Sequence, residues 1–238
     1  GDPHFKTWTG VKFDYHGECD LVLVDNPTFA NGLGLRLHIR TTRRRFFSYI
    51  ERAALQIGSD VFEFAGRNEV YLNGELSPKD RSKVGGFESW FFPKAVSVRL
   101  DDSVKAKIDF IDRKSHMPYV YIDGGSSDIF RGSLGMMGDW ETGKMLGRDG
   151  KTEIQDPELF AAEWQVRDTD PMLFASVRAP QYPAKCTPPA KKLGNRLGDS
   201  LMKQAAEQAC EGWGEDKDEC IFDVMATRDI RAAEAVTF

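Results

Sequence analysis

The first four residues, Gly1-Asp2-Pro3-His4, combine groups that can break a peptide bond. The bond between Asp2 and Pro3 is labile, because the aspartate carboxylate can attack its own peptide carbonyl while the proline nitrogen leaves as a readily protonated amine. His4 titrates near mild acid and can supply that proton. The segment therefore has two interpretations: a self-cleavage site with Asp2 as nucleophile and His4 as acid, or a turn that enters the first strand.

A second candidate site is a glycine-rich loop that carries the acidic side chains Asp139, Glu141 and Asp149. Carboxylate oxygens in such a loop can surround a hard cation such as Ca²⁺. The loop is not an EF-hand, because Gly150 stands where that motif requires a bidentate glutamate. It is either a calcium site of another type or an ordinary turn with solvated acids.

Other arrangements of reactive residues give little support to an enzyme. The four histidines lack metal-ligand spacing, and we expect His38 on the polar face of a strand. No serine occupies a G-x-S-x-G motif, which argues against a serine hydrolase. Asp168 and Asp170 could act as the paired acids of a glycan hydrolase, but Asp170-Pro171 is more typical of a turn. We therefore expect that the chain is not a free-standing enzyme.

The composition is that of a folded globular protein without a nucleic-acid or membrane partner. Hydrophobic residues make up 41% and charged residues 29% of the 238 residues, which argues against disorder. The formal net charge is -5, and the chain lacks the basic footprint of a nucleic-acid-binding protein. No apolar run approaches the length of a membrane span.

The elements that would position these residues are strands over residues 1 to about 130. Alternation of apolar and polar residues marks a strand with one buried face. The turn signal Asn73-Gly74 between two such runs predicts a tight hairpin. Many short strands at this spacing predict a mainly β, antiparallel domain resembling a sandwich. The alternating runs include Val11, Phe13 and Tyr15, then Leu35, Leu37 and Ile39, and finally Pro118 to Ile122.

The pattern changes after residue 130. A glycine-rich loop is followed by Asp156-Pro157, which predicts the capped start of a short helix that runs to Trp164. Prolines between residues 180 and 189 indicate a linker.

The last part of the chain predicts two helices. The first runs from residue 199 or 200 to about residue 210, and a polar turn over 211–217 leads to the second, over 220–236. The second helix carries an apolar stripe formed by Ile221, Val224, Met225 and Ile230.

The four cysteines are compatible with two disulfides, in any of three pairings. Cys210 and Cys220 lie at the facing ends of the two predicted helices, and a bridge between them would clamp the pair. By elimination Cys19 would pair with Cys186 and close a loop of roughly 170 residues, which is worth about 5 kcal/mol. The alternative, four free thiols in a cytosolic protein, stays open.

The motifs at the start of the chain match a known pattern. After Gly1-Asp2-Pro3-His4 come an aromatic-rich hairpin and the run Cys19-Asp20-Leu21-Val22-Leu23. Together they resemble the opening of a von Willebrand factor type D domain, whose signature is GDPH and then G-x-C-x-[YL]-V-L.

Later segments extend this resemblance over nearly the whole chain. The run from Gly135 to Trp140 resembles the family's G-L-C-G-N-F loop, with Met137 in place of the cysteine. Phe160 and Trp164 match its F-x-x-x-W helix, and the last segment resembles the cysteine-containing helical region that follows these domains. The low cysteine content is similar to that of microalgal and other microbial surface proteins.

The resemblance implies a β domain over residues 1–178, a proline-rich linker over 179–192 and a helical, cysteine-containing segment over 193–238. It implies an extracellular structural or adhesive module of a larger secreted or cell-surface protein, with other extracellular proteins or glycans as partners. The alternative is autoproteolysis: Asp2–Pro3 scission at mild acid pH would expose an aspartyl end for crosslinking.

The resemblance also implies bound Ca²⁺. The family's loop ligands fall on Asp139 and Glu141, with Asp149 as a further candidate. A family aspartate on the first hairpin corresponds to Thr9, which cannot offer a carboxylate.

Overall fold

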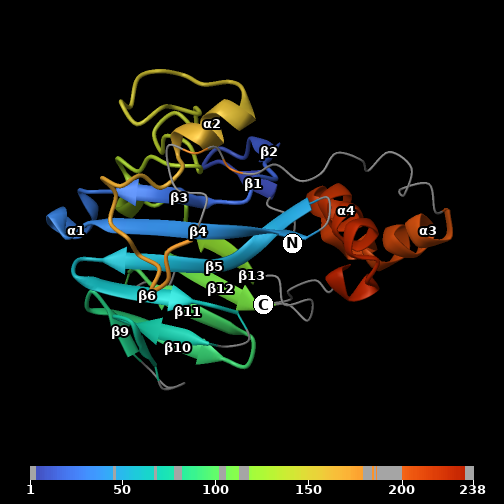
Figure 1. Cartoon of the computed structure of the whole chain (residues 1–238), viewed down its shortest axis with the longest axis horizontal. Coiled ribbons are helices and arrows are strands. Elements are labelled where there is room, and N and C mark those ends of the chain that lie inside the picture. The colour runs from blue at the N-terminus through green and yellow to red at the C-terminus, as the bar shows by residue number, and fades with distance from the viewer. Residues whose placement is uncertain are drawn as a thin grey trace.

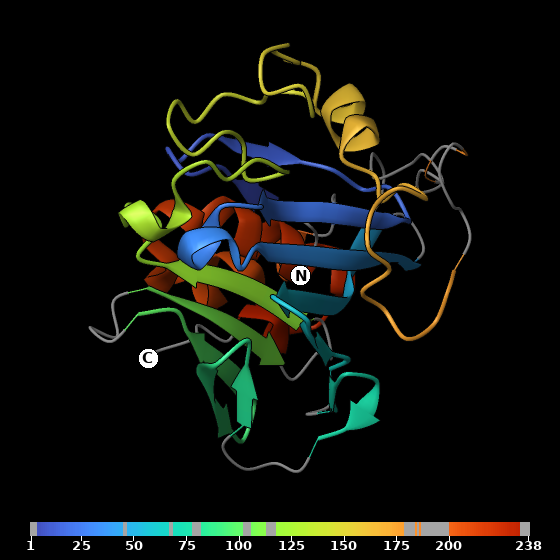
Figure 2. The ribbon, with the colours of Figure 1, turned by 90° about the vertical axis from the view of Figure 1, so that its left-hand side faces the viewer.

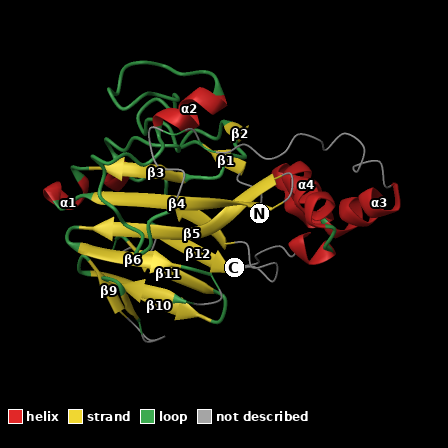
Figure 3. Ribbon diagram, viewed as in Figure 1, coloured by secondary structure: helices red, strands yellow, loops and turns green. Residues whose placement is uncertain are grey.

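The computed structural model describes residues 4–44, 47–66, 69–77, 82–101, 106–112, 118–178, 184, 186 and 200–233. Over these residues the chain is mainly β, with strands in three antiparallel sheets and helices near the C-terminus, so the predicted fold class is confirmed. Figures 1 and 3 show the sheets on one side and helices α3 and α4 on the other. The predicted linker falls outside the described residues except for Ala184 and Cys186.

The larger sheet is a six-stranded meander in which each strand pairs with the next along the chain. The tight hairpin predicted at Asn73-Gly74 is confirmed, because both residues adopt positive φ, 51° and 84°, as a two-residue hairpin turn requires. The strands are β3 (Asp20–Asn26), β4 (Leu35–Arg44), β5 (Phe47–Ile57), β6 (Asp60–Phe64), β7 (Val70–Leu72) and β8 (Glu75–Leu76).

A second sheet packs against the first through a phenylalanine-rich core. Phe110 of the second sheet lies 5.1 Å from Phe62 and 5.9 Å from Phe64, measured between ring centroids. Side chains from two inner faces that meet in this way make a sandwich-like core. The second sheet runs in the order β13-β12-β11-β10-β9. Its strands are β9 (Ser82–Val84), β10 (Phe87–Phe92), β11 (Ala95–Arg99), β12 (Lys107–Asp112) and β13 (Pro118–Asp123).

The first hairpin and the segment after residue 123 complete the β unit. The hairpin pairs β1 (His4–Lys6) with β2 (Lys12–Asp14). Short helical turns α1 (Phe29–Gly32) and η1 (Asp128–Phe130) flank the sheets. Helix α2 (Pro157–Glu163) confirms the predicted cap, because Asp156 Oδ1 accepts a hydrogen bond of 2.9 Å from the Leu159 amide.

The glycine-rich loop lies directly against β3. Leu134 forms an isolated bridge with Asp25, and the amides of Met136 and Met137 donate to carbonyls of β3. Gly135 makes this approach feasible, because it adopts a φ of +132° and a Cβ there would overlap the Leu23 carbonyl. The loop is thereby fixed against β3.

The C-terminal helices form a separate small unit. Its elements are α3 (Ser200–Ala209), η2 (Glu211–Asp216), α4 (Lys217–Thr227) and η3 (Ile230–Ala233). They pack around their own core of Ala206, Cys210, Cys220 and Val224. In Figure 2 this red unit lies behind the strands. None of the helices in the described part of the chain has the length and apolarity that crossing a membrane requires.

Two expectations for this unit were wrong. The segment predicted as a polar turn over 211–217 folds as the 3₁₀ helix η2 and the start of α4. The helix predicted over 220–236 ends instead at Thr227, because Arg228 adopts the left-handed conformation with a φ of 55°. Ile230, assigned to the buried stripe, is consequently 56% exposed, whereas Val224 is fully buried.

The expectation for His38 was also wrong, because its side chain is only 1% exposed. His38 pairs across strands with Ala54, so their side chains share one face of the sheet. That face is covered by Leu173 and Phe174, which pack on Ala54. Figure 1 shows this orange segment after α2 crossing over the strands. Local alternation could not reveal a cover that comes from more than 100 residues later.

Burial of His38 makes the fold sensitive to acid. Burial lowers the pKa of His38 from 6.5 to about 3. Between these pH values the unfolded chain binds a proton that the folded chain rejects. This group therefore reduces the free energy of unfolding as the pH falls from 6.5 toward 3, by up to ~1.4 kcal/mol per pH unit. We expect His38→Leu to have a shallower loss of stability than the native chain over this range in urea titrations. Parallel pH profiles of the two chains would contradict this expectation.

Candidate functional site

The structure places His4, the predicted proton donor, at the start of β1. Asp2 and Pro3, the other two predicted self-cleavage residues, lie outside the described residues. The hairpin register sets His4 opposite Asp14 and Phe5 opposite Phe13. The two phenylalanines stack at 5.2 Å and are buried, so the hairpin is anchored in the core next to His4.

The imidazole of His4 lies between two carboxylates. Its Nδ1 is 2.6 Å from Asp14 Oδ1, and its Nε2 is 3.9 Å from Asp223 Oδ1. The side chains of His4 and Asp223 are 19% and 5% exposed, which reduces screening by water. Negative charges at this distance favour the protonated imidazolium, which is the form that a general acid needs.

The contact with His4 also changes the pKa of the Asp14 carboxyl. The hydrogen bond with His4 is the largest influence on Asp14, and it lowers the pKa of that carboxyl. The charge of His16 acts in the same direction, while partial burial opposes both. The contact with His4 therefore favours the ionised form of the Asp14 carboxyl.

Asp223 comes from α4 and is held by the β unit. The Tyr119 hydroxyl on β13 donates a hydrogen bond of 2.7 Å to Asp223 Oδ2. The neighbouring Phe222 presents its ring to His4 edge to face, with centroids 5.7 Å apart. The helical unit therefore contributes both a charge and an aromatic wall to the surroundings of His4.

Ion pairs fix the helical unit to the first hairpin. Lys12 Nζ lies 2.8 Å from Asp216 and 2.9 Å from Glu219, and these hydrogen bonds raise the pKa of Lys12. A cavity of about 650 Å³ extends from this junction beneath the hairpin, and His4 is on its wall. Its apolar lining includes Phe5, Trp8, Ile39, Met137 and Trp213.

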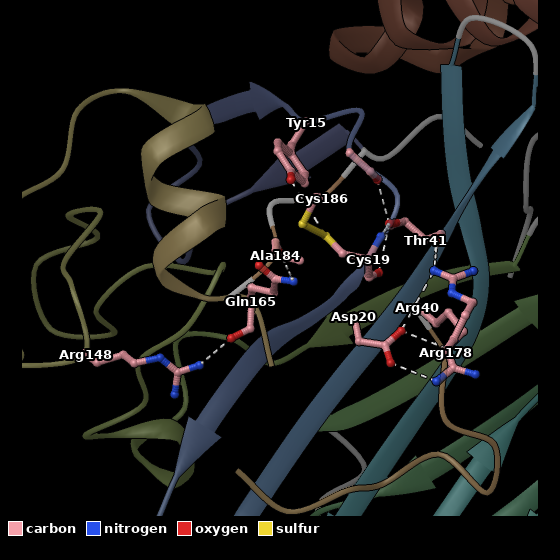
Figure 4. The surroundings of a disulfide bond; sticks show 11 residues. Tyr15, Cys19, Asp20, Arg40, Thr41, Arg148, Gln165, Arg178, Ala184 and Cys186 are labelled. Atoms are coloured by element: carbon pink, nitrogen blue, oxygen red, sulfur yellow. Dashed lines mark hydrogen bonds and ion pairs between the residues drawn. A yellow bond between two sulfur atoms is a disulfide. The ribbon is translucent and has the colours of Figure 1, made fainter. Parts of the chain in front are cut away.

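Cys19 and Cys186 form the disulfide shown in Figure 4, with Cα atoms 5.2 Å apart. The Cys19 amide donates a hydrogen bond of 3.1 Å to Thr41 Oγ1 on β4. On the Cys186 side of the disulfide, Gln165 Nε2 donates a hydrogen bond of 3.0 Å to the Ala184 carbonyl. The bridge therefore ties the segment after residue 178 back to the start of β3.

The second disulfide joins Cys210 at the end of α3 to Cys220 in α4, with Cα atoms 5.8 Å apart. Both sulfur-bearing side chains are buried in the small helical core. All four cysteines are thus paired, in the connectivity expected from the sequence.

Two of the acidic side chains in the glycine-rich loop, those of Asp139 and Asp149, accept hydrogen bonds from residues three positions later in the chain. Asp139 Oδ2 accepts hydrogen bonds from the amide and the hydroxyl of Thr142. Asp149 accepts from the amide and the hydroxyl of Thr152, and the hydroxyl contact is the largest cause that lowers the pKa of Asp149 to about 2. Glu141 is exposed. In the part of the chain that the structure describes, no group of three or more His, Cys, Asp or Glu side chains converges as a metal site.

The tip of the first hairpin nevertheless contacts this loop. Trp8 Nε1 donates a hydrogen bond of 3.1 Å to the Gly138 carbonyl. A Cβ on Gly143 would overlap the Thr9 side chain, so these two residues are in contact. Thr9 thus lies where a hairpin carboxylate would reach the loop.

Calcium binding stays a prediction, and Thr9 offers a direct test. The family pattern predicts that Ca²⁺ raises the melting temperature of the native chain. Thr9→Asp adds a carboxylate beside the loop and should enlarge that rise, whereas Mg²⁺, which demands a tighter octahedral shell, serves as the control cation. A melting temperature that Ca²⁺ leaves unchanged in both chains would contradict the prediction.

Sequence reasoning missed four residues that the structure brings to these sites. One is Asp14, which the hairpin register places opposite His4. Asp223 and Tyr119 meet His4 from distant parts of the chain, and no local signal marks either of them. Arg148, within the predicted calcium loop, donates to Asp170 and to carbonyls of 163 and 165. An arginine among acids could have suggested this structural role.

A scan against models of known protein families finds no match for the chain, and a search of curated proteins also finds none. The likeness to type D domains therefore rests on the sequence motifs, and it stays a prediction.

Proposed function

We propose that the chain is a disulfide-stabilised extracellular β module with a structural or adhesive role. Within that class we propose a module of the von Willebrand factor type D kind, part of a larger secreted or cell-surface protein. Its partners would be other extracellular proteins or glycans.

The observation that carries this proposal is the Cys19–Cys186 disulfide. It joins cysteines separated by 167 residues and closes a loop around nearly the whole β unit. Structural disulfides of this kind persist in oxidising compartments and are rare in the cytosol. Pairing of all four cysteines also leaves no thiol for catalysis or metal binding.

A binding measurement tests the adhesive role. The oxidised chain is fixed to a sensor surface and exposed to purified matrix proteins and to polysaccharides, with the reduced and alkylated chain as the control. The proposal expects saturable binding to at least one of these classes that reduction abolishes. Failure of the oxidised chain to bind any of them, or equal binding by the reduced chain, would contradict it.

A second candidate function is self-cleavage at Asp2–Pro3, and the contacts of His4 favour it. In this step an oxygen of the Asp2 carboxylate attacks the Asp2 peptide carbonyl and forms a cyclic anhydride. The bond to the Pro3 nitrogen breaks, and the His4 imidazolium gives that nitrogen its proton. Water then opens the anhydride by hydrolysis, or a hydroxyl or amine of a neighbouring molecule opens it. Opening by a hydroxyl or amine would crosslink the module to that molecule.

Mild acid tests this second function. A chain with an N-terminal extension is incubated between about pH 4 and pH 7, where histidine titrates, and cleavage is read from gel bands and intact mass. Cleavage is expected in the native chain and not in His4→Ala, while His16→Ala should retain it. A native chain that keeps its extension at every pH would refute self-cleavage.

A further inference from the structure

We propose that Asn31, in the turn between β3 and β4, is a site of spontaneous deamidation, and that the fold protects Asn73 from the same reaction. Each of these asparagines precedes a glycine, in the pairs Asn31-Gly32 and Asn73-Gly74. Asparagine is a chemically labile residue, and a glycine after it leaves the backbone nitrogen accessible because glycine carries no Cβ. This reaction is independent of both proposed functions and concerns the lifetime of the folded chain.

Deamidation joins two groups that lie in adjacent residues. The backbone nitrogen of Gly32 loses its proton to a base in the solvent and attacks Cγ of the Asn31 side chain. The bond between Cγ and the side-chain nitrogen breaks, and that nitrogen leaves as ammonia after taking a proton from water. A five-membered succinimide remains. Water opens this ring at either carbonyl, which gives aspartate or isoaspartate at position 31.

The two Asn-Gly pairs form a matched comparison within one chain. Asn31 and Asn73 both adopt positive φ, 60° and 51°, and the glycine after each also has positive φ. All four residues are exposed. A Cβ built on Gly32 or Gly74 would meet no other heavy atom within 4 Å. Access of water and base to the backbone nitrogen therefore does not distinguish the two pairs.

Hydrogen bonds hold the side chain of Asn73 in place. Its Oδ1 accepts a hydrogen bond of 2.8 Å from the Val61 amide, and its Nδ2 donates one of 3.2 Å to Asp60 Oδ1. Asp60 is itself fixed, because its Oδ2 accepts a hydrogen bond of 2.8 Å from the Gly85 amide. Cγ of Asn73 has to turn toward the Gly74 nitrogen to react, and this rotation breaks both hydrogen bonds of the side chain.

The side chain of Asn31 has no hydrogen bond of this kind among the residues that the structure describes. The Gly32 amide donates a hydrogen bond of 3.1 Å to the Thr28 carbonyl, and this bond has to open before the nitrogen can react. Ala30 in the same turn also adopts positive φ, 47°, which is unfavourable for a residue with a Cβ. This strain lowers the cost of opening the turn, so the fold protects Asn31 less than Asn73.

Conversion of Asn31 to isoaspartate would disturb a contact between the two large sheets. Phe29, two residues earlier, is 2% exposed, and its ring lies 5.4 Å from that of Phe87 on β10. Isoaspartate lengthens the backbone by one carbon between Phe29 and β4. We expect the isoaspartyl form to melt at a lower temperature than the native chain. Asn31→Asp is the matched control, because it adds the charge without lengthening the backbone, and it should melt close to the native chain.

The test follows both asparagines in the full native chain during storage at mildly alkaline pH. Peptide mapping by mass spectrometry measures the mass gained when a side-chain amide becomes a carboxyl group. In the folded chain Asn31 is expected to convert about tenfold faster than Asn73, because breaking two hydrogen bonds raises the barrier at Asn73. In the chain unfolded by guanidinium chloride, the two should convert at similar rates. Asp60→Ala should speed conversion of Asn73 and leave that of Asn31 unchanged.

Equal rates at the two asparagines of the folded chain, or a faster rate at Asn73, would overturn the proposal. The same tenfold ratio in the unfolded chain would also overturn it, because the difference would then come from neighbouring residues and not from the fold. An isoaspartyl form that melts with the native chain would refute the effect on the contact between the sheets. The comparison of folded and unfolded native chains needs no variant, so it decides the matter even if Asp60→Ala does not fold.

Discussion

Replacing Cys19 and Cys186 together by alanine is expected to reduce the free energy of unfolding by about 5 kcal/mol. The bridge spans 167 residues, and the loop entropy that a crosslink removes from the unfolded chain grows with the logarithm of that span. The crosslink also holds the end of the β unit against β3, where Cys19 is buried. Replacing both cysteines avoids leaving a reactive thiol. The measurement is urea unfolding of the native and double-substituted chains, followed by fluorescence.

The second disulfide is the internal control for this prediction. Cys210 and Cys220 are 10 residues apart, and the same relation predicts a stabilisation of about 3 kcal/mol from their bridge. Its loss should act mainly on the helical unit, which has its own core. A Cys19 and Cys186 double substitution that costs no more than the Cys210 and Cys220 one would contradict the view that the long crosslink stabilises the β unit.

Arg148→Ala is expected to destabilise the β unit by about 3 kcal/mol, the scale for breaking a partly buried ion pair. The Arg148 guanidinium donates two hydrogen bonds of 2.9 Å to Asp170 and others to the carbonyls of Glu163 and Gln165. It also packs over the Trp164 ring at 4.9 Å. These contacts join the glycine-rich loop to the segment after α2. Thermal and urea unfolding of the two chains would measure the loss.

Two further variants sharpen this prediction. Arg148→Lys keeps the charge but lacks the planar fork that contacts both oxygens of Asp170, so it should recover only part of the stability. Arg131→Ala removes an exposed arginine that pairs with Asp128, and it should leave the melting temperature nearly unchanged. Equal effects of Arg148→Ala and Arg131→Ala would show that the Arg148 contacts do not stabilise the loop.

Local patterns in the sequence predicted much of the fold, because they depend on neighbouring residues alone. The hairpin at Asn73-Gly74 follows from two residues that tolerate positive φ. The cap at Asp156 follows from a carboxylate placed before a proline at a helix start. The disulfide pairing followed because Cys210 and Cys220 flank a short connection between helices.

What could not be predicted depends on contacts between distant segments. His38 has the alternation of a solvent-facing residue, but it is buried. It shares a face of the sheet with Ala54, on which Leu173 and Phe174 pack. The end of α4 is set by the left-handed Arg228, a residue type with no preference for that conformation.

The candidate site shows the same difference between residues that local sequence patterns identify and residues that only long-range contacts bring together. His4 was identified from its place beside Asp2–Pro3, since the chemistry of that dipeptide is local. Its partners Asp14 and Asp223 were not, because one is set by the hairpin register and the other by docking of the helical unit. Sequence patterns therefore suggested the reaction, and the fold supplied the groups that would control its acid.

The most direct test of an extracellular, disulfide-stapled module is the intact mass of the unreduced protein from the cells that make it. The protein is unfolded in the presence of a thiol-alkylating reagent, so that every free cysteine gains the mass of one adduct. Our account predicts no adduct, because Cys19 pairs with Cys186 and Cys210 with Cys220. A protein that gains four adducts would be fully reduced in its own compartment and would contradict the proposed extracellular role.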